Sequence, residues 1–132
     1  MQNPSGETTT MSAHPNLGMQ PTTFENPMGI DGFEFVEYSA PQDQLGYLHD
    51  YFRKMGFTQV ARHKTRPIHT YRQGDCTFLI NEDPDSFAAR FAAQHGPSAC
   101  GFAIRFNKLA EWVRVQALKN GAEAFDAKDE LS

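Results

Sequence analysis

This chain contains an internal duplication, and that feature constrains its fold more than any other. The strand-like run GFEF at residues 32–35 recurs as GFAI at residues 101–104, 69 positions later. A segment of helical pattern follows each run, and the two segments end at Gly56 and Gly121, 65 positions apart. Because both copies place strand formers before apolar residues at helical spacing, the sequence predicts two related strand-helix units.

The first unit is predicted to be β-α-β-β-β. Its opening strand starts at Gly32 and ends at Ala40, after which Asp43 is placed to cap a helix and Gly56 to end it in a left-handed turn. Three short β-type runs follow, separated by turn residues. The apolar residues at helical spacing are Leu45, Leu48, Phe52 and Met55. The three strands are predicted at residues 57–63, 68–73 and 76–81, with turns at 65–67 and 74–75.

A connector helix and an unfinished second unit complete the pattern. The run at residues 83–86 predicts a helix start with Pro84 in the first turn, and the helix stops at Gly96. The second unit repeats a strand and a helix and then ends after residues 122–125, so the chain is expected to stop inside a domain. The second strand spans residues 101–106, and its helix carries Leu109, Trp112, Val113 and Leu118 before Asn120 and Gly121.

The expected fold class is α+β, with paired β-α-β-β-β modules of which the second is truncated. Residues 24–126 form the domain, with a first module at about 30–81, a connector helix at about 84–95 and a partial second module at about 98–126. Residues 1–23 are expected to be a disordered tail, because a segment this rich in proline and threonine cannot offset its ordering entropy by burial. Residues 127–132 form an acidic end.

Composition excludes several classes of function. The chain has 12 Lys and Arg against 16 Asp and Glu, and a net charge of -4 argues against general attraction to nucleic acid or an anionic membrane. Cys76 and Cys100 do not resemble a secreted disulfide framework. The sequence contains no run of about eighteen apolar residues. A cytoplasmic protein without nucleic-acid or membrane partners is therefore expected.

Several separated blocks of the sequence resemble a known family. They are NPMGI at residues 26–30 leading into GFEFVE at 32–37, MGF at 55–57, YRQG at 71–74, Asn81, and HGPSAC at 95–100. Their order resembles the N-terminal domain of the 4-hydroxyphenylpyruvate dioxygenases, within the vicinal oxygen chelate superfamily of paired β-α-β-β-β modules. The likeness covers residues 25–126 and weakens over 107–115, where the spacing is one residue longer.

The resemblance implies an Fe(II)-dependent dioxygenase of tyrosine catabolism, which converts 4-hydroxyphenylpyruvate and oxygen into homogentisate and carbon dioxide. In that family two histidines and one glutamate of a C-terminal catalytic domain hold the iron. The equivalent strand openings here, by the internal repeat, are Gly32 and Gly101, which have no side chain to bind a metal. We therefore expect no catalytic, cofactor-binding or metal-binding residue in this chain, which would be inactive alone. Its expected partner is the C-terminal catalytic domain of the parent enzyme, and the full-length enzyme is expected to be a homo-oligomer.

Two other functions stay open at this point. One is a small binding module that stands alone, as in superfamily members that enclose a ligand between two chains. The other is the matching part of a hydroxymandelate synthase, which acts on the same substrate and makes a different product. The residues that separate the two enzymes belong to the C-terminal domain.

Some side chains could imitate a functional site, although a structural role is the simpler interpretation for each. His63 and His69 could form a two-histidine, one-carboxylate site with Glu34 or Glu37. The other histidines are expected to have no such role, with His14 in the tail, His49 on a polar helix face and His95 at a helix end. A solvated hairpin is expected for the basic run, which consists of Arg62, His63, Lys64, Arg66, His69 and Arg72. Cys100 is expected to be an inert thiol, and residues 73–75 and 96–98 are expected to form turns.

Overall fold

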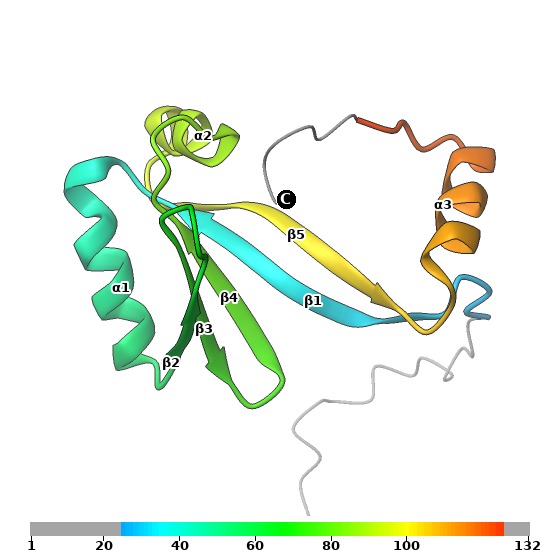
Figure 1. Cartoon of the computed structure of the whole chain (residues 1–132), viewed down its shortest axis with the longest axis horizontal. Helices are drawn as coiled ribbons and strands as arrows, with labels where there is room; N and C mark the ends of the chain where they lie inside the picture. The colour runs from blue at the N-terminus through cyan, green and yellow to red at the C-terminus, as the bar shows by residue number, and fades with distance from the viewer. Residues whose placement is uncertain (1–24, 126–132) are drawn as a thin grey trace, which may run out of the picture.

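The structure, a computed structural model, describes residues 25–125 and contains five strands and three α-helices within that range (Figure 1). The predictions for residues 1–23, including His14, and for residues 127–132 lie outside the described residues. The order of elements is the predicted β-α-β-β-β unit, a connector helix, and a second strand and helix. The elements are β1 Ile30–Ser39, the 3-10 turn η1 Gln42–Gln44, α1 Leu45–Lys54, β2 Thr58–Arg62, β3 Ile68–Gln73, β4 Cys76–Asn81, α2 Phe87–His95, β5 Ser98–Phe106 and α3 Ala110–Lys119.

All five strands belong to one mixed sheet in the order β2-β3-β4-β1-β5. The turns between β2, β3 and β4 are short and make antiparallel pairs, whereas β1 is parallel to β4 because α1 and the hairpins carry the chain between them. The two units meet where β1 pairs antiparallel with β5, with Glu37 opposite Gly101 and Phe35 opposite Ala103. This α+β architecture confirms the predicted fold class.

The core of the first unit lies between α1 and one face of the sheet (Figure 1). Phe52 of α1 is 2% exposed, and Tyr71 and Ile80 of the sheet are fully buried. The Phe52 ring lies 5.6 Å from the Tyr71 ring and 5.2 Å from that of Phe78. Burying one such side chain contributes about 1.5–3 kcal/mol. The rest of the cluster consists of Ala40, Leu45, Leu48 and Phe57.

Both predicted helix starts need correction. Asp43 does not cap α1, since it lies inside the 3-10 turn, and among the described residues no side chain makes a cap hydrogen bond there. Pro84 does not lie in the first turn of α2, because that helix begins at Phe87. Its N-cap is Ser86, whose hydroxyl accepts the Ala89 N–H at 3.1 Å. The serine provides the stronger local signal, since its oxygen satisfies an otherwise free backbone donor.

Both strands that join the two units begin earlier than predicted. β1 begins at Ile30, whose backbone N–H and C=O are both hydrogen-bonded by the Asn26 side chain at 3.0 Å. β5 begins at Ser98, which pairs with Ser39 at the other end of β1. Asp31 and Gly32 interrupt the strand formers near the start of β1, and β5 begins with the small residues Ser98 and Ala99, so a search for strand-forming side chains missed both starts. Residues 122–125, which follow α3, have no regular secondary structure.

The predicted ends of both repeated helices are confirmed. Gly56 and Gly121 have φ values of 93° and 94°, the left-handed conformation that favours glycine. α3 lies at the far end of the β1–β5 ribbon, well separated from α1 (Figure 1). Within residues 25–125, no helix has the length and apolar character needed to cross a membrane.

Candidate functional site

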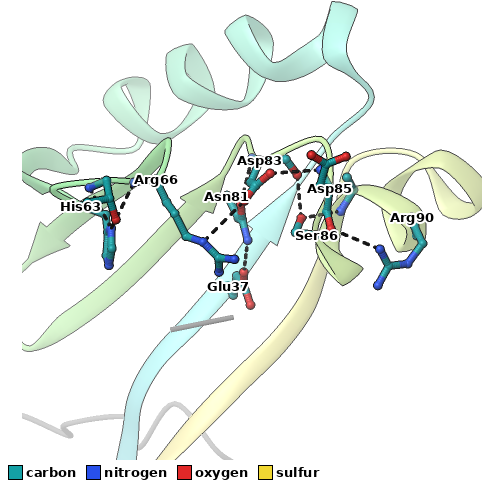
Figure 2. Close-up of polar contacts among 10 residues, drawn as sticks. Glu37, His63, Arg66, Asn81, Asp83, Asp85, Ser86 and Arg90 are labelled. Atoms are coloured by element: carbon teal, nitrogen blue, oxygen red, sulfur yellow. Dashed lines mark hydrogen bonds and ion pairs between the residues drawn. The ribbon is translucent and has the colours of Figure 1, made fainter. Parts of the chain in front are cut away.

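The histidine site considered from the sequence is not assembled, because His63 is engaged locally. Its Nδ1 atom accepts the backbone N–H groups of Thr65 and Arg66 at 3.3 and 3.2 Å, so the ring organises the turn between β2 and β3 (Figure 2). Arg66 in turn reaches Asp83, with 3.7 Å between Nε and Oδ2. This part of the basic run is therefore a hairpin turn with a carboxylate partner.

The two glutamates of that hypothetical site also point elsewhere. Glu34 lies 3.7 Å from the Arg105 guanidinium on the neighbouring strand. Glu37 accepts a 2.7 Å hydrogen bond from the Asn81 amide (Figure 2). Of the four residues considered from the sequence, only His69 belongs to the cluster described next.

The structure brings His69 together with two residues that sequence reasoning had not joined to it. His49 comes from α1, His69 from β3, and Glu82 directly follows β4, and one ligand atom of each lies within 4.8 Å of the others. Nε2 of His49 hydrogen-bonds Oε1 of Glu82. Nε2 of His69 lies 3.7 Å from that same oxygen, and the two imidazole rings meet edge to face at 4.9 Å.

Both histidines are also held through their second ring nitrogen. His49 Nδ1 shares a 2.6 Å hydrogen bond with the hydroxyl of Tyr71, which is fully buried. His69 Nδ1 lies 2.9 Å from the side-chain amide of Gln59 on β2. Because these contacts fix the two rings from behind, both Nε2 atoms face Glu82.

The cluster is partly buried yet reachable from solvent. Its side chains are 12% exposed for His49, 15% for His69 and 27% for Glu82. They line a shallow pocket together with Gln59 and the ion pair of Asp50 and Arg53, whose charged atoms are 3.5 Å apart. A cluster of two imidazoles and a carboxylate in such a pocket can hold a proton or a divalent cation.

Burial shifts the pKa of two side chains at this pocket. Desolvation lowers the pKa of His69, against the opposing charge of Glu82, and His49 and Arg62 lower it further. The His69 ring is therefore neutral at neutral pH, which is the form that ligates metals. Desolvation also raises the pKa of Tyr71, so that its hydroxyl keeps its proton.

The expectation that His49 occupies a polar helix face is wrong, and the spacing of residues in the sequence already indicates a buried face. His49 follows Leu45 by four residues, so the two share a helix face. The tight turn of the β3–β4 hairpin pairs Gln73 with Cys76. Continuing this register away from the turn places Glu82 opposite Pro67, so that Glu82 lies diagonal to His69 on the same hairpin. Hairpin register alone therefore predicts that His69 and Glu82 are neighbours.

The positions that correspond to iron ligands in the resemblance do not fit an iron site. A Cβ atom at Gly32 would meet the Arg105 guanidinium at 3.9 Å, and one at Gly101 would meet the Glu37 carboxylate at 3.2 Å. Neither glycine has a ligand atom in its side chain, and a guanidinium repels a cation. Gly32 also has a φ of 83°, which disfavours any larger residue.

The remaining candidates lie apart from the cluster. The Cys100 thiol is partly buried and lies 3.5 Å from the Glu37 carbonyl oxygen. Of residues 73–75, Gln73 ends β3 and 74–75 form the β3–β4 turn, and Gly96 ends α2 with a φ of 77°. His95 is the last residue of that helix, as predicted, and its ring packs 4.4 Å from Phe91.

Comparison with known proteins places the chain among longer relatives. A 4-hydroxyphenylpyruvate dioxygenase from Pseudomonas sp. (strain P.J. 874) is 45% identical over 100 residues, which are 76% of this chain and 27% of the relative. Hemolysin VllY from Vibrio vulnificus (strain CMCP6) is 46% identical over 104 residues, 76% of this chain and 28% of that protein. The chain thus spans little more than a quarter of the length of these curated relatives.

A solved structure and a family model agree with these relatives. A xylose isomerase-like TIM barrel/4-hydroxyphenylpyruvate dioxygenase fusion protein has a TM-score of 0.62 and 26% identity, over 76% of this chain and 16% of that chain. The family model described as "Hydroxyphenylpyruvate dioxygenase, HPPD, N-terminal" matches residues 24–132. The chain therefore belongs to the family of hydroxyphenylpyruvate dioxygenase N-terminal domains.

Proposed function

We propose that this chain is the N-terminal, non-catalytic part of a 4-hydroxyphenylpyruvate dioxygenase, which converts 4-hydroxyphenylpyruvate and oxygen into homogentisate and carbon dioxide. The observation that carries the proposal is the family match over residues 24–132, together with dioxygenase relatives of whose length the match covers little more than a quarter. In the whole enzyme Fe(II), held by another domain, supplies the oxygen chemistry. Glycine at positions 32 and 101 supports the view that this domain provides no ligand for the catalytic iron.

The role of the domain in this proposal is structural support. Apolar side chains on β1, on β5 and just before α3 remain exposed, with Phe33 at 60%, Phe102 at 64% and Leu109 at 81%. Such a surface suits contacts with the rest of the parent enzyme and with other subunits. The same proposal includes a homo-oligomeric parent in the cytoplasm, without nucleic-acid or membrane partners.

An oxygen-uptake assay tests the catalytic half of this proposal. The purified chain, supplied with Fe(II), ascorbate and 4-hydroxyphenylpyruvate, is expected to consume oxygen no faster than a protein-free control. Homogentisate formation, followed by chromatography, is expected to be equally absent. Steady turnover by this chain alone would overturn the assignment of a non-catalytic domain.

A chimera tests the support role. The chain replaces the matching segment of the Pseudomonas sp. dioxygenase, and the matched control is the remainder of that enzyme expressed without any N-terminal domain. The chimera is expected to form homogentisate at least tenfold faster than the control. A folded chimera that is no more active than the control would contradict the proposed role.

A further inference from the structure

We propose that His49, His69 and Glu82 form a binding site for a divalent first-row transition metal of the zinc type, which joins α1 to the β3–β4 hairpin. This site departs from the sequence-based expectation that the chain holds no metal. The proposal is independent of the dioxygenase assignment, because the cluster lies on the α1 side of the sheet and its test uses no enzyme activity.

The ligand set has the chemistry that such an ion prefers. Two imidazoles and one carboxylate are a common protein ligand set for zinc, which leaves a fourth position for water. The three ligand atoms lie within 4.8 Å of one another, and the cluster opens to solvent through the pocket that it lines. Glu82 is the one acidic side chain of the set, and its carboxylate would offset part of the charge of the ion.

One of the three ligand separations already lies near that of a tetrahedral site. Zinc bonds of about 2.0–2.2 Å put neighbouring ligand atoms about 3.3–3.6 Å apart. The 3.7 Å between His69 Nε2 and Glu82 Oε1 is close to that separation. The hydrogen bond between His49 and Glu82 must lengthen to admit the ion, which then takes the place of the shared proton.

The contacts behind the rings also match a metal site. Ligating histidines usually form a hydrogen bond through the nitrogen that faces away from the ion, and this bond fixes the ring. Here the Tyr71 hydroxyl lies 2.6 Å from Nδ1 of His49, and the Gln59 amide nitrogen lies 2.9 Å from Nδ1 of His69. A half-turn of that amide would present its oxygen, which accepts from a protonated Nδ1 and leaves Nε2 free to ligate. Both Nε2 atoms are thus left to face Glu82. A simple hydrogen-bonded pair of His49 and Glu82 would not require the second imidazole at this point.

Zinc titration against a chromophoric chelator tests the site in the full chain after stripping of metal. The wild-type chain is expected to bind one Zn²⁺ ion with a dissociation constant in the micromolar range or below. His69→Gln and Glu82→Gln each remove one ligand while retaining a polar side chain of similar size. Each variant is expected to weaken binding at least tenfold. Absence of stoichiometric binding by the wild-type chain would overturn the proposal.

Two matched controls separate this site from other histidines. His63→Gln changes a histidine in the neighbouring turn, and His14→Gln changes one outside the described residues. Both variants are expected to bind zinc within twofold of the wild-type chain. If either control weakens binding as much as His69→Gln, the metal binds elsewhere and the proposal is wrong.

A measurement on the wild-type chain keeps the proposal testable if a variant fails to fold. In a proton-carbon correlation spectrum, one equivalent of zinc is expected to shift the imidazole signals of His49 and His69. Those of His63 and His95 should stay in place. Shifts confined to the latter pair would contradict the site.

Discussion

The two strand-helix units share a pattern yet bury their helices very differently. α1 buries Leu45, Leu48 and Phe52 against the sheet, whereas α3 buries Val113, and its neighbour Trp112 remains 39% exposed. The difference lies in the strands. β2, β3 and β4 widen the sheet beneath α1, while α3 lies at the end of a two-stranded ribbon (Figure 1). An apolar helical stripe becomes a core only where a sheet is broad enough to cover it.

Truncating one aromatic residue in each helix gives the largest expected contrast. Phe52→Ala removes a ring that contacts those of Tyr38, Phe57 and Tyr71 and leaves a cavity, which should cost about 3–5 kcal/mol of unfolding free energy. Trp112→Ala removes a part-exposed ring and its contact with the Lys108 ammonium, which should cost about 1 kcal/mol. Urea unfolding monitored by circular dichroism measures both.

The difference between the two losses of unfolding free energy tests the comparison of α1 with α3 better than either loss alone. If Trp112→Ala destabilises the chain as much as Phe52→Ala, then α3 has a core equal to that of α1 and the comparison fails. Phe87→Ala is a useful third variant, since Phe87 is 50% exposed on the connector helix and is expected to resemble Trp112.

Substituting the glycines that end α1 and α3 compares the two helices again, with a smaller expected loss of stability. Alanine in a left-handed conformation costs about 1–2 kcal/mol at either site. At Gly56 the new Cβ would also lie 2.7 Å from Nε2 of Gln73, whereas at Gly121 it would meet nothing within 4 Å in the described part of the chain. Gly56→Ala is therefore expected to lower the global melting temperature more than Gly121→Ala. An equal loss from both would indicate that α3 unfolds together with the first unit.

Much of this fold could be predicted from local patterns. Alternation of strand formers located β3 and β4, and helical spacing located α1, because these elements bury one face each. The duplication correctly predicted that a second strand and helix would follow the connector. The starts of α1 and α2 were missed, since Asp43 and Pro84 are compatible with a helix start but compete there with a 3-10 turn and with Ser86.

The candidate site was harder to predict because it depends on tertiary contacts. Its residues are separated by 20 positions from His49 to His69 and by 13 from His69 to Glu82. Hairpin register accounts for the second separation, but the first depends on where α1 crosses the sheet. The pairing of His63 with His69 was the obvious choice in sequence, yet backbone N–H groups of the turn already occupy His63.

Helix capping provides the smallest expected effect and the most local one. The Ser86 hydroxyl caps α2 by accepting the N–H of the third residue that follows, whereas α3 begins after Leu109, which is 81% exposed and, like its described neighbours, provides no side-chain cap. Leu109 already has an extended backbone, with a φ of -60° and a ψ of 133°, so a serine there could accept the Trp112 N–H in the same way. Leu109→Ser should stabilise α3 by about 1 kcal/mol, which slows amide exchange in that helix about fivefold.

Ser86→Ala is the matched control and should accelerate exchange in α2 by a similar factor. Because α3 adds little to the core, the Leu109→Ser gain is expected in α3 amides alone, with exchange in β3 and β4 unchanged. Slower exchange throughout the sheet would instead mean that α3 and the first unit open together. That result would contradict the distinction between α1, which the sheet covers, and α3, which it does not.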